Sequence, residues 1–120
     1  MILVDTSVWV DHLRSGNARL AEELEIGRVL AHPFVIGELA CGTLGNRREV
    51  LDLLTRLPSA SIATHAEALT FLERRSLMGR GIGFIDVHLL ASAALTNQAR
   101  LWTRDRRLAV IATELHLAYA

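Results

Sequence analysis

The sequence predicts an α/β domain built around a mostly parallel sheet, and three observations lead to this prediction. Short apolar segments alternate along the chain with longer segments whose apolar residues have helical spacing. Glycine, proline and capping residues stand between these segments. The 120 residues suit one domain, 1–120, and contain no linker, repeat or low-complexity tract.

Short apolar segments mark the expected strands. The first, "ILVD", has the composition of a buried strand and ends on the carboxylate of Asp5. We expect a sheet of about five strands, at residues 2–5, 28–32, 61–63, 101–103 and 115–120.

Capping residues mark the first two helices. Thr6 or Ser7 is the expected cap of a helix that runs through Leu13. Asn17 is the expected cap of the next helix, and Gly27 is its expected left-handed stop.

Proline and a capping box mark the middle of the chain. Pro33 suits the first turn of a helix that Gly42 ends, and Pro58 closes the helix after it. Thr64 with Glu67 three residues later forms a capping box before another helix.

The last third of the chain begins with a glycine loop, "GRGIG", at residues 79–83. The segment 84–97 is apolar on nearly all sides, which predicts a buried helix. A short helix is expected at about 105–112, between the last two strands.

The composition indicates the cellular location of the protein and argues against a disulfide or a histidine metal site. Cys41 is the only cysteine, which rules out an internal disulfide and fits a cytoplasmic protein. Because Cys41 occupies an apolar position, we expect it to be a small residue of the core. No apolar run spans a membrane and no signal peptide is apparent. The five histidines show no metal-ligand spacing, so each is expected to be structural or exposed.

Four carboxylates stand outside the polar helix faces that hold most of the others. Asp5 ends one predicted strand and Asp105 follows another. Glu38 lies among apolar residues, and Asp86 lies near the start of the most buried predicted helix. Each also has a purely structural explanation: a helix cap for Asp5 and Asp105, a helix dipole for Asp86, and an arginine partner for Glu38.

Taken together, the four acids favour a metal site. The carboxyl ends of parallel strands meet at one edge of a sheet, where α/β proteins place their sites. Carboxylates gathered there repel one another, and Mg²⁺ or Mn²⁺ relieves that repulsion with oxygen ligands. Such a site activates water for attack on a phosphate.

The basic residues are compatible with binding to a nucleic acid. The formal net charge is zero, but all 13 basic residues are arginine, and nine acids remain once the four candidate site acids are set aside. Arginine binds phosphate well, and solvated helix faces explain the same residues equally well. The candidates beside the site are Arg80, Arg104, Arg106 and Arg107.

At these residues the chain resembles a known family. The segments "ILVDTSVWVDHL", "GELACG", "GIGFIDVHLLASA" and "LWTRDRRL" are together similar to the PIN domain, and more narrowly to the VapC toxins of bacterial type II toxin–antitoxin pairs. The resemblance covers essentially the whole chain.

The resemblance implies a compact α/β/α fold and a ribonuclease that depends on Mg²⁺ or Mn²⁺. Asp5 and Asp86 would be the principal metal ligands, and Glu38 and Asp105 would complete the acidic quartet directly or through water. Polar side chains would support them, namely Thr6, Ser7 and Thr103. The implied partners are tRNA or rRNA, a VapB-type antitoxin and a second copy of the chain.

Other α/β classes with an aspartate after the first strand are excluded. Haloacid-dehalogenase-like phosphatases and response-regulator receiver domains need a lysine, and the chain contains none. A P-loop is absent for the same reason. The remaining alternative is a degenerate PIN domain that binds RNA or a protein without catalysis.

Overall fold

The computed structural model describes residues 1–120 and contains one parallel sheet of three strands. Strand β1 (Ile2–Val4) lies between β2 (Val29–Leu30) and β3 (Arg100–Trp102). The register pairs Ile2 with Val29 and Arg100, and Leu3 with Leu30 and Leu101. Because both neighbours are parallel to β1, the carboxyl ends of all three strands lie at one edge.

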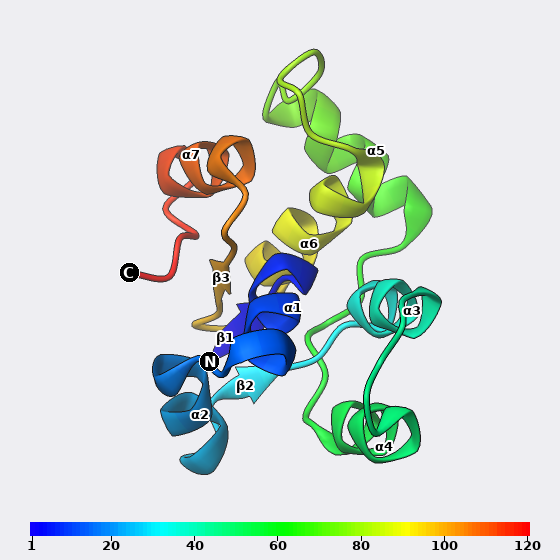
Figure 1. Cartoon of the computed structure of the whole chain (residues 1–120). Coiled ribbons are helices and arrows are strands. Elements are labelled where there is room, and N and C mark those ends of the chain that lie inside the picture. The colour runs from blue at the N-terminus through cyan, green and yellow to red at the C-terminus, as the bar shows by residue number, and fades with distance from the viewer.

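Helices surround this small sheet (Figure 1). Their bounds are α1 (Thr6–Ser15), α2 (Ala18–Glu25), α3 (Pro33–Cys41), α4 (Arg47–Arg56), α5 (His65–Arg74), α6 (Phe84–Leu95) and α7 (Arg106–Glu114). Helix α6 contacts β3 and α5, while α3 contacts α1 and α4. Figure 1 shows α7 and the C-terminus on the opposite side of the sheet from α3 and α4. The prediction of an α/β domain with a parallel sheet is confirmed.

The hydrophobic core forms around β1 and α6. All three residues of β1 are buried and belong to one cluster of 21 buried apolar side chains. In α6, every residue from Val87 to Ala93 is buried, which confirms the predicted buried helix. These two elements therefore provide rigid supports for the residues at their ends.

Two of the predicted helix caps are present as expected. The Asn17 side chain accepts a hydrogen bond of 3.0 Å from the backbone N–H of Leu20 at the start of α2. Thr64 and Glu67 form the predicted capping box, with hydrogen bonds of 2.9 and 3.1 Å. Local sequence signals were sufficient for these helix starts.

The predicted cap of α1 was wrong. Asp5 occupies the N-cap position, and Thr6 and Ser7 belong to the helix. The carboxylate of Asp5 nevertheless makes no capping hydrogen bond, and its Oδ2 accepts hydrogen bonds from two side-chain hydroxyl groups instead. The structural explanation of Asp5 as a helix cap therefore does not account for it.

The predicted sheet of about five strands was also too large. Residues 61–63 form no strand, because two of their backbone N–H groups bind side chains instead of a neighbouring strand. One of these side chains belongs to α6, and the other follows α6 directly. Ser61 donates to Thr96 Oγ1 at 2.9 Å, and Ala63 donates to Ser92 Oγ at 3.2 Å. The segment is therefore held against α6 and does not join the sheet.

At the two outer edges of the sheet, the backbone pairing consists only of isolated bridges. Ser59 pairs with Ala31 beyond β2, and Ala118 pairs with Leu101 of β3, both in parallel. Residues 115–120 therefore lie along the edge of the sheet without forming the predicted strand. Each bridge still extends the backbone pairing by one residue pair and covers part of an open edge.

Two further findings concern the single cysteine and the lengths of the helices. Cys41 is exposed at the end of α3, so its prediction as a core residue was wrong. No helix has the length and apolar character needed to cross a membrane.

A buried histidine joins the helices that carry two of the candidate acids. His32 is fully buried at the N-cap of α3, where its Nδ1 accepts a hydrogen bond of 3.0 Å from the backbone N–H of Phe34. Its Nε2 lies 3.2 Å from Ser92 Oγ of α6, which suits a neutral ring that donates from Nε2. Burial, and secondarily the charge of His88, lowers the pKa of His32 from its usual 6.5 to about 4.

We expect this histidine to make the fold sensitive to acid. Because the pKa of His32 is lower in the folded protein, the unfolded chain takes up the proton first as the pH falls. The contribution of neutral His32 to the free energy of unfolding is therefore fully present above pH 6.5 and is lost as the pH falls towards 4. This difference in pKa corresponds to about 3 kcal/mol at most. Thermal unfolding between pH 7 and pH 4, compared between the wild type and His32→Gln, measures it.

His65 supplies the control, because it is an exposed histidine at the start of α5. The loss of melting temperature on acidification should be smaller in His32→Gln than in the wild type and unchanged in His65→Gln. Equal acid sensitivity in all three proteins would show that His32 does not carry the effect.

Candidate active site

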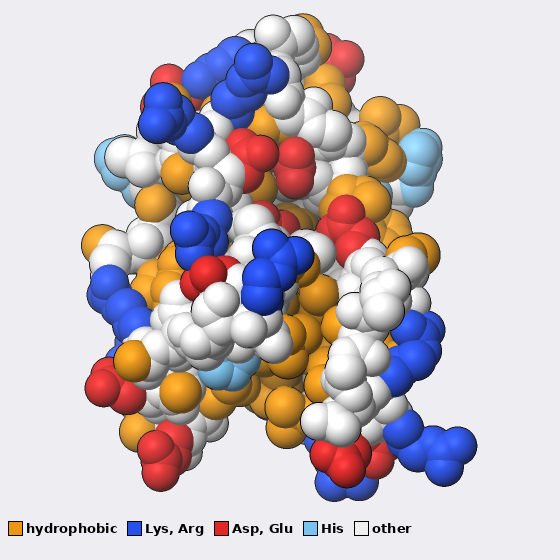
Figure 2. Space-filling view, in the orientation of Figure 1, with side chains coloured by type: hydrophobic (Ala, Val, Ile, Leu, Met, Phe, Trp, Pro, Cys, Tyr) orange, Lys and Arg blue, Asp and Glu red, His pale blue; other side chains and the backbone are white.

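The four candidate acids come from elements that approach the carboxyl edge of the sheet. Asp5 follows β1, Asp105 lies three residues after β3, Glu38 belongs to α3 and Asp86 lies in the first turn of α6. Figure 2 shows acidic side chains around a hollow in the middle of one face, with arginine side chains near them.

Asp5 is the most buried of these acids, with 7% of its surface exposed. Its Oδ2 accepts a hydrogen bond of 2.8 Å from Ser7 Oγ and one of 2.7 Å from Thr103 Oγ1. The two hydroxyl groups lie 3.3 Å apart. A buried carboxylate needs such donors, and these hold it in one orientation.

Thr103 connects Asp5 with Asp105. Its Oγ1 donates to Asp5 and accepts a hydrogen bond of 3.0 Å from the backbone N–H of Asp105. Asp105 is exposed, and its Oδ1 caps α7 by accepting from the backbone N–H of Leu108 at 3.0 Å. Asp105 is therefore a helix cap, as its structural explanation predicts, and its other carboxylate oxygen has no protein partner.

Glu38 is exposed on α3 and contacts α1. Its Oε1 accepts a hydrogen bond of 2.7 Å from Thr6 Oγ1. The structural explanation of Glu38 as an arginine partner was wrong, because the residue takes part in no ion pair. Thr6 instead ties Glu38 to the turn that follows Asp5.

Asp86 lies within the electrostatic influence of the other three acids. It is partly buried, and its Oδ2 accepts a hydrogen bond of 3.1 Å from the backbone N–H of Gly83. Burial raises the pKa of Asp86, and the negative charges of three neighbours raise it further against that hydrogen bond. These neighbours are Asp5, Asp105 and Glu38.

No positive side chain neutralises this group. The ion pairs of the structure include none of the four acids. As the side chains stand, no three of the Asp, Glu, His and Cys residues lie close enough to ligate one ion together. The chain therefore provides a loose group of unneutralised carboxylates rather than a closed ligand cage.

A groove of about 540 Å³ adjoins this acidic group. Glu38 lines one side of it. Most of the remaining lining comes from α1, from the loop between α3 and α4, and from α4 itself. Its apolar side chains are Val10, Leu13, Leu39, Leu44 and Val50. Through Glu38 alone, the acidic group borders a concave surface that has room for part of a larger molecule.

The four candidate arginines differ in their contacts. Arg80 pairs with Glu114 at 2.7 Å, and Arg104 pairs with Asp11 at the same distance. Arg106 and Arg107 take part in no ion pair. Arg107 packs against Gly81, where an added Cβ would lie 2.7 Å from its Nη1.

The sequence reasoning missed the contacts of Asp11 and Gly81. A signal for Asp11 was available, because it lies four residues after Ser7 and so on the same face of α1. Gly81 gave no comparable signal, since its neighbour Arg107 comes from a distant part of the chain.

Comparisons with known proteins identify the family of this chain. The family model of the PIN domain matches residues 2–114. "Ribonuclease VapC32" from two strains of Mycobacterium tuberculosis, CDC 1551 / Oshkosh and H37Rv, is 51% identical to this chain over 120 residues. The match covers the whole of this chain and 97% of each relative. The chain therefore belongs to the PIN domain family and, within it, to the VapC-type proteins.

Proposed function

We propose that this protein is an endoribonuclease that depends on Mg²⁺ or Mn²⁺ and serves as the toxin of a VapBC-type toxin–antitoxin pair. One observation carries the catalytic part of the proposal: four carboxylates at the edge of the sheet have no ion-pair partner, and the charges of three of them raise the pKa of the fourth, Asp86. The name "ribonuclease" of the VapC32 relatives supports RNA as the substrate.

The acidic group fits a hard divalent cation. Mg²⁺ keeps several of its water ligands and needs only one or two protein carboxylates beside the oxygens of a phosphate substrate. A loose group of four carboxylates therefore suits it better than a closed cage does. When bound, such an ion activates water and offsets negative charge at the phosphate during hydrolysis.

The side chains have distinct parts in this proposal. Asp5 and Asp86 hold the cation, and Glu38 and Asp105 complete its surroundings directly or through water. Hydroxyl groups fix the carboxylates, because Ser7 and Thr103 donate to Asp5 and Thr6 donates to Glu38. The residues of the supporting set are thus Thr6, Ser7 and Thr103.

The proposed partners follow from the same family. We propose a tRNA or rRNA substrate, a VapB-type antitoxin that covers the acidic group, a homodimer, and action in the cytoplasm. The groove beside Glu38 supports the first two, because it offers space next to the site for a segment of RNA or of the antitoxin. Arginines at positions 80, 104, 106 and 107 are the proposed contacts with the RNA backbone.

Replacing either principal ligand should abolish RNA cleavage. We expect Asp5→Asn and Asp86→Asn each to reduce kcat by more than about 100-fold, because losing even an outer partner of a metal ligand costs roughly 10- to 100-fold. Cleavage of a panel of tRNA and rRNA by metal-free protein, with Mg²⁺ or Mn²⁺ added and then removed with EDTA, measures this effect.

The matched control is Asp52→Asn, which removes one exposed carboxylate from α4 and should cleave like the wild type. In EDTA at pH 7, Asp86→Asn should melt no lower than the wild type, because it removes a charge that its neighbours repel. A wild type that cleaves no RNA with either metal would contradict the proposed nuclease and favour a non-catalytic binding module.

A second prediction concerns Arg107 and the glycine loop. Gly79 and Gly81 both have positive φ, 71° and 83°, so alanine is strained at either position. An added Cβ meets nothing at Gly79 but meets the Arg107 side chain at Gly81. We therefore expect Gly81→Ala to weaken RNA binding roughly threefold more than Gly79→Ala, because only the former displaces one phosphate-binding group.

Fluorescence anisotropy with a labelled single-stranded RNA in EDTA measures this difference. Both variants should lose similar thermal stability, on the order of 1 kcal/mol, which separates backbone strain from the loss of Arg107. Equal RNA affinities of the two variants would remove Arg107 from the proposed contacts.

A further inference from the structure

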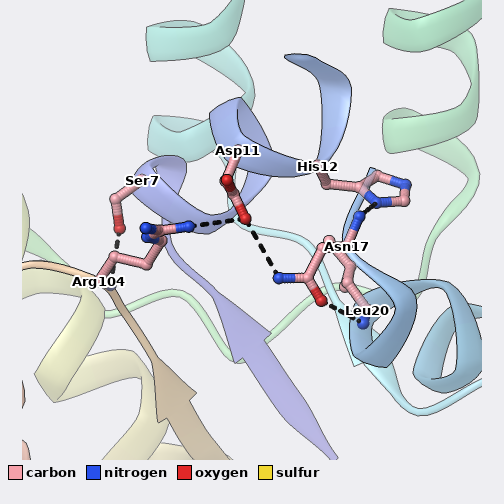
Figure 3. A network of polar contacts seen from close by, with 6 residues as sticks. All are labelled: Ser7, Asp11, His12, Asn17, Leu20 and Arg104. Atoms are coloured by element: carbon pink, nitrogen blue, oxygen red, sulfur yellow. Dashed lines mark hydrogen bonds and ion pairs between the residues drawn. The ribbon is translucent and has the colours of Figure 1, made fainter. Parts of the chain in front are cut away.

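Arg104 is tied to α1 at two points beside the acidic group (Figure 3). Its backbone N–H donates to Ser7 Oγ at 2.9 Å, and the same Ser7 hydroxyl donates to Asp5. Its Nη1 lies 2.7 Å from Asp11 Oδ2. Ser7 and Asp11 lie one helical turn apart, so α1 holds both the backbone and the side chain of Arg104.

Asp11 is itself fixed by the start of α2. Asn17 Nδ2 donates to Asp11 Oδ2 at 3.3 Å, while Asn17 Oδ1 caps α2 through the backbone N–H of Leu20. The backbone N–H of Asn17 donates to His12 Nδ1 at 3.1 Å. Figure 3 shows these residues in one connected network. The position of Asp11 therefore depends on a helix cap and not on α1 alone.

Asp11 remains charged throughout the neutral range. The hydrogen bond from Asn17 lowers the pKa of Asp11, and the contact and charge of Arg104 lower it further against the effect of desolvation. A permanent negative charge therefore faces Arg104 at the margin of the site.

The ion pair leaves much of the guanidinium free. Asp11 meets Nη1 only, and neither Nε nor Nη2 of Arg104 donates to another protein atom. The side chain of Arg104 is 56% exposed, against 30% for Asp11. A planar guanidinium held at one nitrogen retains donors in the geometry that suits a phosphate.

We propose that Asp11 is a positioning residue, which holds the guanidinium of Arg104 beside the acidic group so that its free N–H groups bind an RNA phosphate next to the cleaved bond. The inference rests on the proposed ribonuclease function and deepens it. An RNA backbone is repelled by four carboxylates, and a fixed arginine offsets that repulsion. Holding the side chain before RNA binds also reduces the entropy lost on binding.

A competing role for Asp11 predicts the opposite effect. If Asp11 only occupied Arg104, it would compete with RNA, and its removal would strengthen binding. If Asp11 positions Arg104, its removal weakens binding although the protein becomes less negative. The direction of the change in RNA affinity therefore separates the two roles.

The test compares Asp11→Asn with Asp52→Asn. Asp52 forms an exposed ion pair of 3.0 Å with Arg56 in α4, so both variants lose the same charge and one ion pair. We expect Asp11→Asn to raise KM roughly threefold or more relative to Asp52→Asn, as loss of an exposed pair implies, and to leave kcat within about twofold. Asp11→Ser provides a second variant at this position.

Binding in EDTA, where RNA is not cleaved, tests the same contact. The affinity for a labelled single-stranded RNA is measured against salt for the wild type, Arg104→Ala, Asp11→Asn and the double variant. Arg104→Ala should lower the log–log salt slope by roughly 0.7, the value of one phosphate contact. In the Arg104→Ala background, Asp11→Asn should have no further effect, because Asp11 acts through Arg104.

Three results would overturn the proposal: equal RNA affinities of Asp11→Asn and Asp52→Asn, tighter binding by Asp11→Asn than by Asp52→Asn, or an undiminished effect of Asp11→Asn in the Arg104→Ala background. The proposed function fails separately, when the wild type cleaves no RNA. The binding measurements in EDTA still test the role of Asp11 in that case.

Discussion

The position of β1 between two parallel strands is the constraint on which the site depends. Its three residues are buried and pair with β2 on one side and β3 on the other. The chain therefore leaves all three strands at one edge, where Asp5 follows β1 and Thr103 follows β3. Helix α3, which carries Glu38, begins two residues after the bridge at Ala31 beyond β2. A change that shifted β1 would move each of these residues relative to the others.

The buried carboxylate of Asp5 explains why hydroxyl groups gather at this edge. A charge at the end of a core strand is costly unless donors surround it. Ser7 and Thr103 supply two donors, and they also connect Asp5 to the backbone of Arg104 and Asp105. These hydroxyl groups orient Asp5 but carry no positive charge, so the repulsion from the other acids persists. A bound divalent cation would offset this repulsion.

Much of the fold could be predicted because its signals are local. The buried strand after Met1, the cap at Asn17, the capping box at Thr64 and the buried helix α6 all follow from short stretches of sequence. The strand predicted at 61–63 was wrong because Ser92 and Thr96, about 30 residues away, bind its backbone N–H groups. Such a contact has no counterpart in the local pattern.

The four acids could likewise be selected from their places at strand and helix ends, but their contacts could not. The local cap at Asp105 is the exception, because the sequence offered it and the structure contains it. The sequence did not reveal that Asp5 caps nothing and binds Thr103, or that Thr6 rather than an arginine binds Glu38. These outcomes depend on side-chain geometry between segments 30 to 100 residues apart in the chain. The same limit applies to Asp11, whose partner Arg104 comes from the other end of the sequence.

The central proposal is that the four carboxylates together form a site for divalent metal. Calorimetric titration of Mn²⁺ into metal-free protein tests it without requiring a substrate. The wild type and Asp52→Asn should bind Mn²⁺ alike, and Asp5→Asn and Asp86→Asn should each lose most of that binding. Undiminished Mn²⁺ binding by both Asp5→Asn and Asp86→Asn would contradict the claim.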